Sequence, residues 1–361
     1  MRAQQVLDAG TSIWLDDLSR AKISGADSHS LPSRIATSGV VGVTTHPSIF
    51  SAAISGAAEY SADIAQMKSA SVDDVVKKLT TDDVRQACDL FTQIYTSSKG
   101  VDGRVSIEVD PRLAHDTEGT IAAGKELWKI IDRPNVMIKV PATIEGLPAI
   151  TELIAAGISV NVTLIFSVKR YGQVIDAYMQ GIDRCENPSS VHSVASFFIS
   201  RVDAEVDKRL DLIGTPTALA LRGRAAIAQA KLAYERFRTT FSGERWEKLA
   251  QQGASVQRPL WASTSTKNPS YPDTLYVDEL IGHDSVNTLP DATLEAFADH
   301  GTLRTTIDQN VHESHRVWVA LAEVGVDMDD VARQLEDEGV LSFQKGFDEL
   351  LTALSDKAQT F

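Results

Sequence analysis

The chain has 361 residues and a formal net charge of −14 at neutral pH, and 43% of its residues are hydrophobic. This acidic balance disfavours nucleic acid and anionic membrane surfaces as partners. The only two cysteines, Cys88 and Cys185, are too few for a disulfide framework or a cysteine-based metal site. No apolar run resembles a signal segment or approaches the length of a membrane span, so we expect a cytoplasmic protein.

Eight short apolar or alternating segments are predicted as β-strands, and most are separated by helical patterns. Strands that alternate with helices pair in parallel, so eight of them predict a (β/α)8 barrel. No repeat, low-complexity tract or linker divides the chain, so we expect one domain over residues 1–361. The predicted strands are 11–17, 39–43, 104–109, 136–140, 158–164, 191–200, 258–263 and 285–288.

Helical spacing of apolar residues fills most of the intervals between these strands. Residues 202–254 are predicted to be almost wholly helical, with 218–241 the most regular part. They form a long helical insertion after the sixth strand, and the acidic tail from Asp291 is also predicted to be helical. The other predicted helices are 17–35, which loosens around 26–30, then 52–68, 72–79, 82–97, 114–131, 146–156 and 167–184.

The stretch 135–167 reads as strand, helix and strand, and it carries a lysine inside an apolar strand. Alternation places Lys139 on one face of its strand, and Asn161 and Thr163 on one face of the next strand. Polar groups near strand ends suit a closed barrel, whose site lies at the C-terminal ends of its strands. Burial disfavours an ammonium ion, and a neutral amine can attack a carbonyl. A lone lysine is better explained by a side chain that reaches water or forms an ion pair, but the polar neighbours Asn161 and Thr163 favour chemistry.

Other polar residues stand at the ends of the remaining strands. They supply acid, amine and hydroxyl groups around one face of the barrel, which fits covalent carbonyl chemistry by a lysine with carboxylates that move protons. No spaced cluster of His, Asp and Glu suggests a metal, and we expect no cofactor. These residues are Asp16, the turn 44–48, Glu108, Ser196, Arg201, Ser263 and Lys267.

These residues lie in blocks that resemble the transaldolase family in order along the chain. The lysine block IKVPAT at 138–143 and the block NVTLIFS at 161–167 are the most specific. The segments WLDDLSR and HSVASFFISRVD are similar to those of actinobacterial transaldolases, which belong to the class I, Schiff-base aldolase superfamily. The other blocks are WLDD at 14–17, GVTTHPS at 42–48, SIEV at 106–109, SFFISR at 196–201 and ASTSTKN at 262–268.

The resemblance implies an enzyme of the pentose phosphate pathway that acts on sugar phosphates. A dihydroxyacetone unit would pass from sedoheptulose 7-phosphate to glyceraldehyde 3-phosphate, leaving erythrose 4-phosphate and forming fructose 6-phosphate. Lys139 would form a Schiff base with the ketone, and Asp16 would move the proton during cleavage. Glu108 would shuttle protons through a water held by Thr163.

The resemblance also implies the residues that bind substrate. Asn161 and Ser196 would hydrogen-bond the dihydroxyacetone unit, and Phe198 would wall the pocket. Arg201 would hold the phosphate together with Lys267, which stands where many relatives have arginine. A lysine still attracts phosphate but lacks the bidentate fork of arginine.

Two positions leave a question open. Asp16 and Asp17 are adjacent, and side-chain alternation together with the Leu-Asp pattern of the family favours Asp16. His46 stands where relatives usually carry an asparagine that bonds the dihydroxyacetone unit. Pro47 biases His46 to an extended backbone, so we expect the imidazole near the pocket, and the alternative is that it turns away.

Three competing functions remain. One is a related class I aldolase that releases dihydroxyacetone, although such chains are usually short and carry Tyr at the position of Phe198. Another is a deoxyribose-phosphate aldolase, whose lysine lies on a later strand. The third is a sugar-phosphate-binding barrel without activity, which the set Asp16, Glu108 and Lys139 disfavours. The protein is expected to be a monomer or a homodimer.

Overall fold

The computed structural model describes residues 2–55, 58–67 and 69–358. Within them, eight strands close into a barrel in sequence order, and every strand pairs in parallel with its neighbours, β8 with β1 included. The predicted (β/α)8 barrel is confirmed. The strands are β1 (Thr11–Leu15), β2 (Val40–Val43), β3 (Arg104–Glu108), β4 (Val136–Pro141), β5 (Val160–Ile165), β6 (Ser193–Phe198), β7 (Arg258–Ala262) and β8 (Ser285–Leu289).

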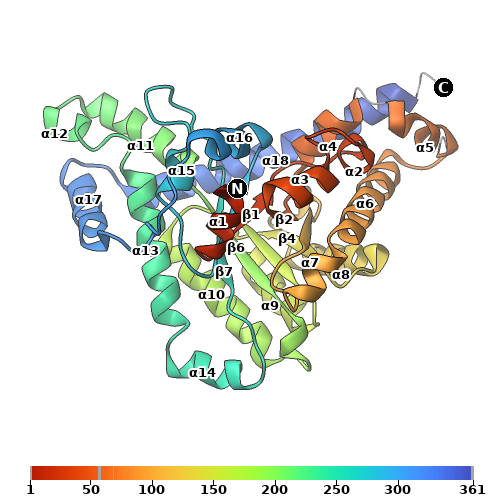
Figure 1. The fold of residues 1–361 in the computed structure, drawn as a ribbon, viewed down its shortest axis with the longest axis horizontal. Helices are drawn as coiled ribbons and strands as arrows, with labels where there is room; N and C mark the ends of the chain where they lie inside the picture. The colour runs from red at the N-terminus through yellow and green to blue at the C-terminus, as the bar shows by residue number, and fades with distance from the viewer. Residues whose placement is uncertain (1, 56–57, 68, 359–361) are drawn as a thin grey trace.

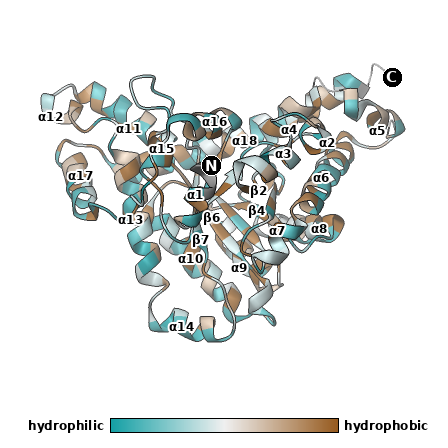
Figure 2. Cartoon of the chain, in the orientation of Figure 1, coloured by the Kyte–Doolittle hydropathy of each residue, from teal (hydrophilic) through white to brown (hydrophobic). Residues whose placement is uncertain are grey.

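Helices surround the barrel, and hydrophobic colouring gathers on the strands and on the inner helix faces (Figures 1 and 2). No helix among the described residues is both long and apolar enough to cross a membrane. The helices between β1 and β6 are α2 (Arg20–Ser24), α3 (Leu31–Ser38), α4 (Pro47–Ser55), α5 (Ser61–Gln66), α6 (Val72–Leu90), α7 (Thr92–Ser97), α8 (Thr117–Ile131), α9 (Gly146–Ala155) and α10 (Val168–Asp183); α1 (Arg2–Asp8) precedes β1.

The long helical insertion after the sixth strand is confirmed, but it is broken more often than its pattern predicts. It consists of α11 (Ser200–Ile213), α12 (Pro216–Leu219), α13 (Ala225–Thr240) and α14 (Glu244–Gln251). Gly214 and Gly223 both have a φ of 68°. A left-handed glycine ends a helix, so the predicted regular stretch 218–241 becomes a short helix, a turn and then α13.

Three other parts of the helix prediction differ from the structure. The stretch 17–35 contains two helices, because the hydroxyls of Ser19 and Ser30 each cap the N-terminus of a new one. The predicted helix 72–79 and most of the predicted helix 82–97 form one continuous helix, α6, and residues 92–97 form the separate helix α7. The hydroxyls of Thr80 and Thr81 donate hydrogen bonds to backbone carbonyls one turn earlier, so these residues do not interrupt the helix α6. The predicted helix 52–68 corresponds to α4 and α5, and residues 56, 57 and 68 lie outside the described residues.

The N-terminal end of the barrel is closed by side chains. Gly42 on β2 leaves the space that the Trp14 indole fills, because a Cβ there would lie 2.7 Å from the ring. Below it, Arg258 donates hydrogen bonds to Ser12 Oγ (2.8 Å) and Asp102 Oδ1 (3.0 Å), and Ser12 donates to Asp102 Oδ2 (2.9 Å). These polar groups bond to one another at the N-terminal end of the barrel. A site is therefore expected at the C-terminal ends of the strands.

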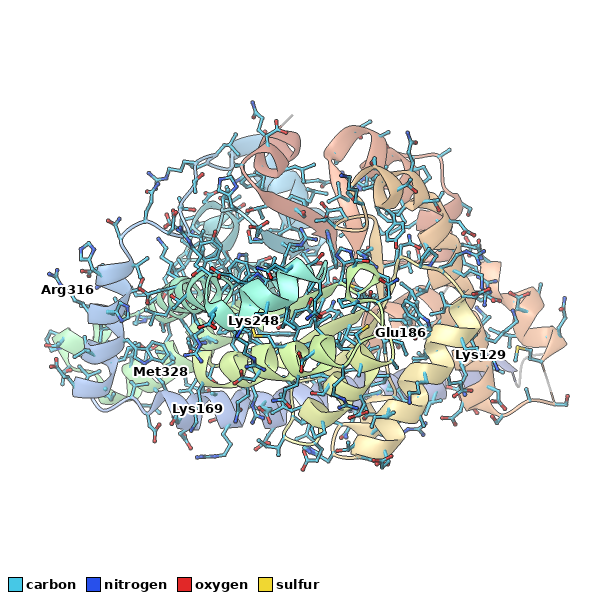
Figure 3. The ribbon with its side chains drawn as sticks, turned by 90° about the horizontal axis from the view of Figure 1, so that it is seen from below. Lys129, Lys169, Glu186, Lys248, Arg316 and Met328 are labelled. Atoms are coloured by element: carbon cyan, nitrogen blue, oxygen red, sulfur yellow. The ribbon has the colours of Figure 1, made fainter. Side chains whose placement is uncertain are left out.

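The C-terminal part of the chain is helical, as predicted, and it returns to the barrel. After α15 (Leu275–Asp278), α16 (Asp291–His300) and α17 (Val311–Glu323), the 31-residue helix α18 (Met328–Ala358) packs on α4, α6, α11 and β5. Figure 1 shows it crossing from the side of α11 and α17 to the side of α4 and α5, and Figure 3 shows it leaving the labelled Met328. The tail therefore lies against elements that are far from it in sequence.

Candidate active site

A cavity of about 330 Å3 opens at the C-terminal ends of the strands. Eight of the ten residues predicted for the site line it, which places them around one space. Glu108 and Asn161 do not line it and lie just behind its wall. The eight lining residues are Asp16, His46, Lys139, Thr163, Ser196, Phe198, Arg201 and Lys267.

Lys139 is buried at the centre of this arrangement, with 4% of its surface exposed. Its Nζ donates a hydrogen bond to the backbone carbonyl of Thr45 (3.0 Å) and lies 3.6 Å from Glu108 Oε2. Glu108 and Lys139 are register partners on β3 and β4, so the sheet itself sets the two side chains side by side. The amine is therefore held by the fold and protected from bulk water.

Glu108 is a carboxyl group in a poor environment for charge. Burial raises its pKa to about 7, although Lys139 opposes the shift. Its Oε2 and the Thr163 hydroxyl are both buried, and neither has a hydrogen-bond partner among the described residues. A carboxyl group with such a pKa can both take and give a proton at neutral pH.

The two adjacent acids Asp16 and Asp17 have different surroundings. Asp16 lines the cavity, and its Oδ1 accepts a 2.6 Å hydrogen bond from Thr44. Asp17 does not line the cavity. It forms an ion pair with Lys22 on α2, at 3.1 Å. Of the two acids, Asp16 is therefore the one that faces the cavity.

His46 lies in the cavity wall rather than turned away from it. Its Nε2 is 3.8 Å from Asp16 Oδ2, and its ring lies parallel to that of Phe343, with centroids 5.9 Å apart. Burial lowers the pKa of His46, Lys139 and Arg201 lower it further, and Asp16 opposes them. The imidazole is thus favoured in its neutral form.

Asn161 connects the cavity to the barrel interior. Its Nδ2 donates to Ser106 Oγ (3.0 Å), and its Oδ1 accepts a hydrogen bond from Ser196 (2.6 Å). The amide of Asn161 therefore orients the Ser196 hydroxyl, which does line the cavity. One amide hydrogen and one lone pair of Asn161 remain beyond these bonds.

The outer part of the cavity is positively charged. Arg201 lies in the first turn of α11, with its guanidinium carbon 5.4 Å from the centre of the Phe198 ring. Within the described part of the chain, no carboxylate lies within 4 Å of Arg201; burial lowers its pKa, and Glu338 partly offsets this. Lys267 is exposed on the loop after β7 and donates to Ser265 Oγ (2.8 Å). Two cations with few anionic partners can receive an anion.

Sequence reasoning missed several residues of the site. Thr288 at the end of β8 could have been found by the same strand-end rule that found Asp16. Ser342 and Phe343 could not, because they come from α18, about 200 positions after Lys139, and their helical pattern carries no sign of the barrel mouth. All three line the cavity.

Residues 13–354 of the chain match the family described as Transaldolase/Fructose-6-phosphate aldolase. The chain belongs to this family. Similar proteins named transaldolase include one from Mycolicibacterium smegmatis, 54% identical over 352 residues, which covers 96% of this chain and 94% of the relative. "Transaldolase 1" of Streptomyces coelicolor is 52% identical over 98% of this chain and 93% of its own length. A transaldolase of Frankia alni is 51% identical over 97% and 95%.

Membership of the transaldolase family confirms the resemblance seen in the sequence blocks, including its actinobacterial character. It makes the protein an enzyme of the transferase class. The matched region includes β1 from residue 13, β2 to β8, the insertion α11–α14 and most of α18, so the site described above lies wholly inside it.

Proposed function

We propose that the protein is a transaldolase that forms a Schiff base at Lys139. It transfers a dihydroxyacetone unit from sedoheptulose 7-phosphate to glyceraldehyde 3-phosphate, in the pentose phosphate pathway, and yields erythrose 4-phosphate and fructose 6-phosphate. The observation that carries the proposal is the buried amine of Lys139, which faces the cavity with Glu108 on one side and Asp16 across it. The relatives named transaldolase support the same reaction.

The first step is addition of the Lys139 amine to the ketone carbon of the donor. The carbinolamine that results must lose water to give an iminium ion, so its hydroxyl needs a proton. Glu108 supplies that proton and later takes one back, which its pKa of about 7 permits near neutral pH. A water bound between Glu108 Oε2 and Thr163 Oγ1 would satisfy both buried atoms and carry the proton.

Asp16 then acts at the bond that breaks. It takes the proton from the hydroxyl on the fourth carbon of the donor, that carbon becomes the aldehyde of erythrose 4-phosphate, and the bond electrons move to the iminium to form an enamine. The enamine carbon attacks the aldehyde of glyceraldehyde 3-phosphate, and Asp16 returns its proton to the new alkoxide. Addition of water and loss of the Lys139 amine release fructose 6-phosphate. Thr44 holds the Asp16 carboxylate in place throughout.

The remaining residues bind the substrate. Ser196 and Asn161 hydrogen-bond the hydroxyls of the dihydroxyacetone unit, and His46 contributes a donor or acceptor from the opposite wall. Phe198 forms the apolar wall. Arg201 and Lys267 hold the phosphate at the outer end of the cavity, the guanidinium as a fork and the ammonium as a point charge.

The proposal is tested by a coupled assay with sedoheptulose 7-phosphate and glyceraldehyde 3-phosphate, and by borohydride trapping in fructose 6-phosphate. We expect continuous formation of erythrose 4-phosphate only with the acceptor present, and a reduced dihydroxyacetone adduct on the peptide that contains Lys139. Lys139→Met should abolish both. Lys231→Met is the matched control, because Lys231 lies on α13 outside the cavity, is 6% exposed and pairs with Glu279. Release of free dihydroxyacetone without acceptor would indicate an aldolase instead, and an unmodified Lys139 would refute the Schiff base.

A further inference from the structure

Two glycines allow the C-terminal helix α18 to pack closely over the C-terminal end of the barrel. A Cβ on Gly339 would lie 2.9 Å from Leu164 at the end of β5, and a Cβ on Gly346 would lie 2.5 Å from Ser48 Oγ at the start of α4. The two glycines and Phe343 follow the spacing i, i+4, i+7 and so share one helix face. The backbone of α18 therefore comes close to the barrel on both sides of Phe343, and this ring is directed into the mouth.

Phe343 contacts two residues of the proposed chemistry at once. Its ring lies parallel to the imidazole of His46, at 11° between planes, and its centroid is 5.2 Å from Lys139 Nζ. Only 5% of Phe343 is exposed. An aromatic face attracts a cation at this distance, and the ring also keeps water away from the amine.

We propose, on the basis of the transaldolase function proposed above, that Phe343 holds His46 in place and directly stabilises positive charge on the Lys139 nitrogen. The nitrogen that the ring faces is the atom that carries the positive charge of the iminium, so the ring stabilises that intermediate more than the neutral amine. The same ring packs His46 beside Asp16. The active site is then incomplete without α18, although every other proposed residue comes from the barrel strands, the loops that follow them or the first turn of α11.

The proposal predicts that loss of the Phe343 ring lowers the reaction rate, whereas a loss of packing alone would lower only the stability. Phe343→Leu should lower kcat about tenfold, the effect of losing a single favourable contact in the transition state, and change the KM for fructose 6-phosphate by less than about twofold. Trapping by borohydride should slow in parallel. Phe343→Tyr keeps the ring and should restore most of the activity, and Phe343→Met gives a second variant without a ring if the leucine variant folds poorly.

The pH profile gives an independent readout. The charged groups that face His46 are Asp16 after β1, Lys139 on β4 and Arg201 on α11, and α18 presents the uncharged ring of Phe343. Removal of the ring admits water, so the burial that lowers the pKa of His46 is relieved. The acid limb of the Phe343→Leu profile should therefore move to higher pH.

Leu354→Ala is the control for docking of the helix. Leu354 is 1% exposed on α18 and does not line the cavity, so its loss should lower the melting temperature and leave kcat and the acid limb unchanged. The inference is overturned if Phe343→Leu changes only the melting temperature, or if Leu354→Ala reproduces its kinetic effects. An inactive wild type that is not trapped at Lys139 would instead refute the proposed function.

Discussion

The Thr44 hydroxyl lies 2.6 Å from Asp16 Oδ1 and 2.6 Å from Thr288 Oγ1, and so joins the ends of β1, β2 and β8. A hydroxyl has one hydrogen, so Thr44 donates to the carboxylate and accepts from Thr288. These two hydrogen bonds, from Thr288 to Thr44 and from Thr44 to Asp16, fix the orientation of the Asp16 carboxylate. It leaves Oδ2 for His46 and for a substrate hydroxyl.

This orientation predicts different results for the two adjacent acids. Asp16→Asn keeps the shape of the side chain but removes its ability to take a proton, so kcat should fall by about 10²- to 10⁴-fold. Asp17→Asn should keep kcat near that of the wild type, because its half-exposed pair with Lys22 contributes at most about 1 kcal/mol to folding. Steady-state kinetics of both variants decide the assignment. A large loss of kcat in Asp17→Asn alone would reverse it.

The second prediction concerns the pH dependence of stability through Glu108. Its pKa rises from the usual 4.5 to about 7 on folding, so the folded state binds the proton more tightly. The stabilisation from this group is complete below pH 4.5 and is lost as the pH rises through 7, with a difference on the order of 3 kcal/mol. Glu108→Gln does not titrate. Its melting temperature should therefore exceed that of the wild type by more at pH 8 than at pH 5.

Glu108→Gln should also lower kcat and remove a transition near pH 7 from the rate profile, because the proton carrier is gone. Asp203→Asn is the matched control. Burial raises the pKa of Asp203 to about 6, but this carboxylate on α11 accepts a hydrogen bond from Tyr276 on α15 and does not line the cavity. It should alter the pH dependence of the melting temperature and leave the transition in the rate in place. The same rate transition in Glu108→Gln as in the wild type would contradict the proposed role.

The sequence was most informative where chemistry depends on strand parity. Alternation placed Lys139 and Thr163 on the inner face, and the register of β4 and β5 brings them to one cavity. Helix boundaries were predicted less well, because a left-handed glycine such as Gly214 and a cap such as Ser30 decide them locally within a favourable helical pattern. Phe343 lay beyond sequence reasoning, since its position depends on the packing of α18 across the barrel.

The third prediction concerns recognition of phosphate. Arg201→Ala should raise the KM for phosphorylated substrates about 10- to 100-fold, the loss expected for charge-assisted hydrogen bonds, and leave unphosphorylated aldehydes unaffected. Lys267→Ala should have a smaller effect that fades with added salt, because Lys267 is exposed. Arg209→Ala is the control on the same helix, where Arg209 pairs with Glu205 and Asp330. An equal loss with phosphorylated and unphosphorylated substrates would show that Arg201 does not recognise phosphate.

The last prediction rests on His46, which we expect to stand in place of an asparagine of the family pattern. Its Nδ1 is buried and has no partner among the described residues, while Nε2 is 3.8 Å from Asp16. Burial, Lys139 and Arg201 keep its pKa below the usual 6.5. The imidazole is then neutral at pH 7 and can replace part of the hydrogen bonding of an amide.

Below pH 6.5 this neutral state is progressively lost. An imidazolium at His46 would face the iminium on Lys139 and disfavour it, so the rate should fall along an acid limb that lies below pH 6.5. His46→Asn does not titrate and should remove this limb while it keeps activity at pH 7. His192→Asn is the matched control: His192 is also buried, with a pKa lowered to about 3, but it lies before β6 at the closed end of the barrel. Rate profiles of the three proteins between pH 4.5 and 8 test the assignment, and superimposable profiles for wild type and His46→Asn would mean that another group produces the limb.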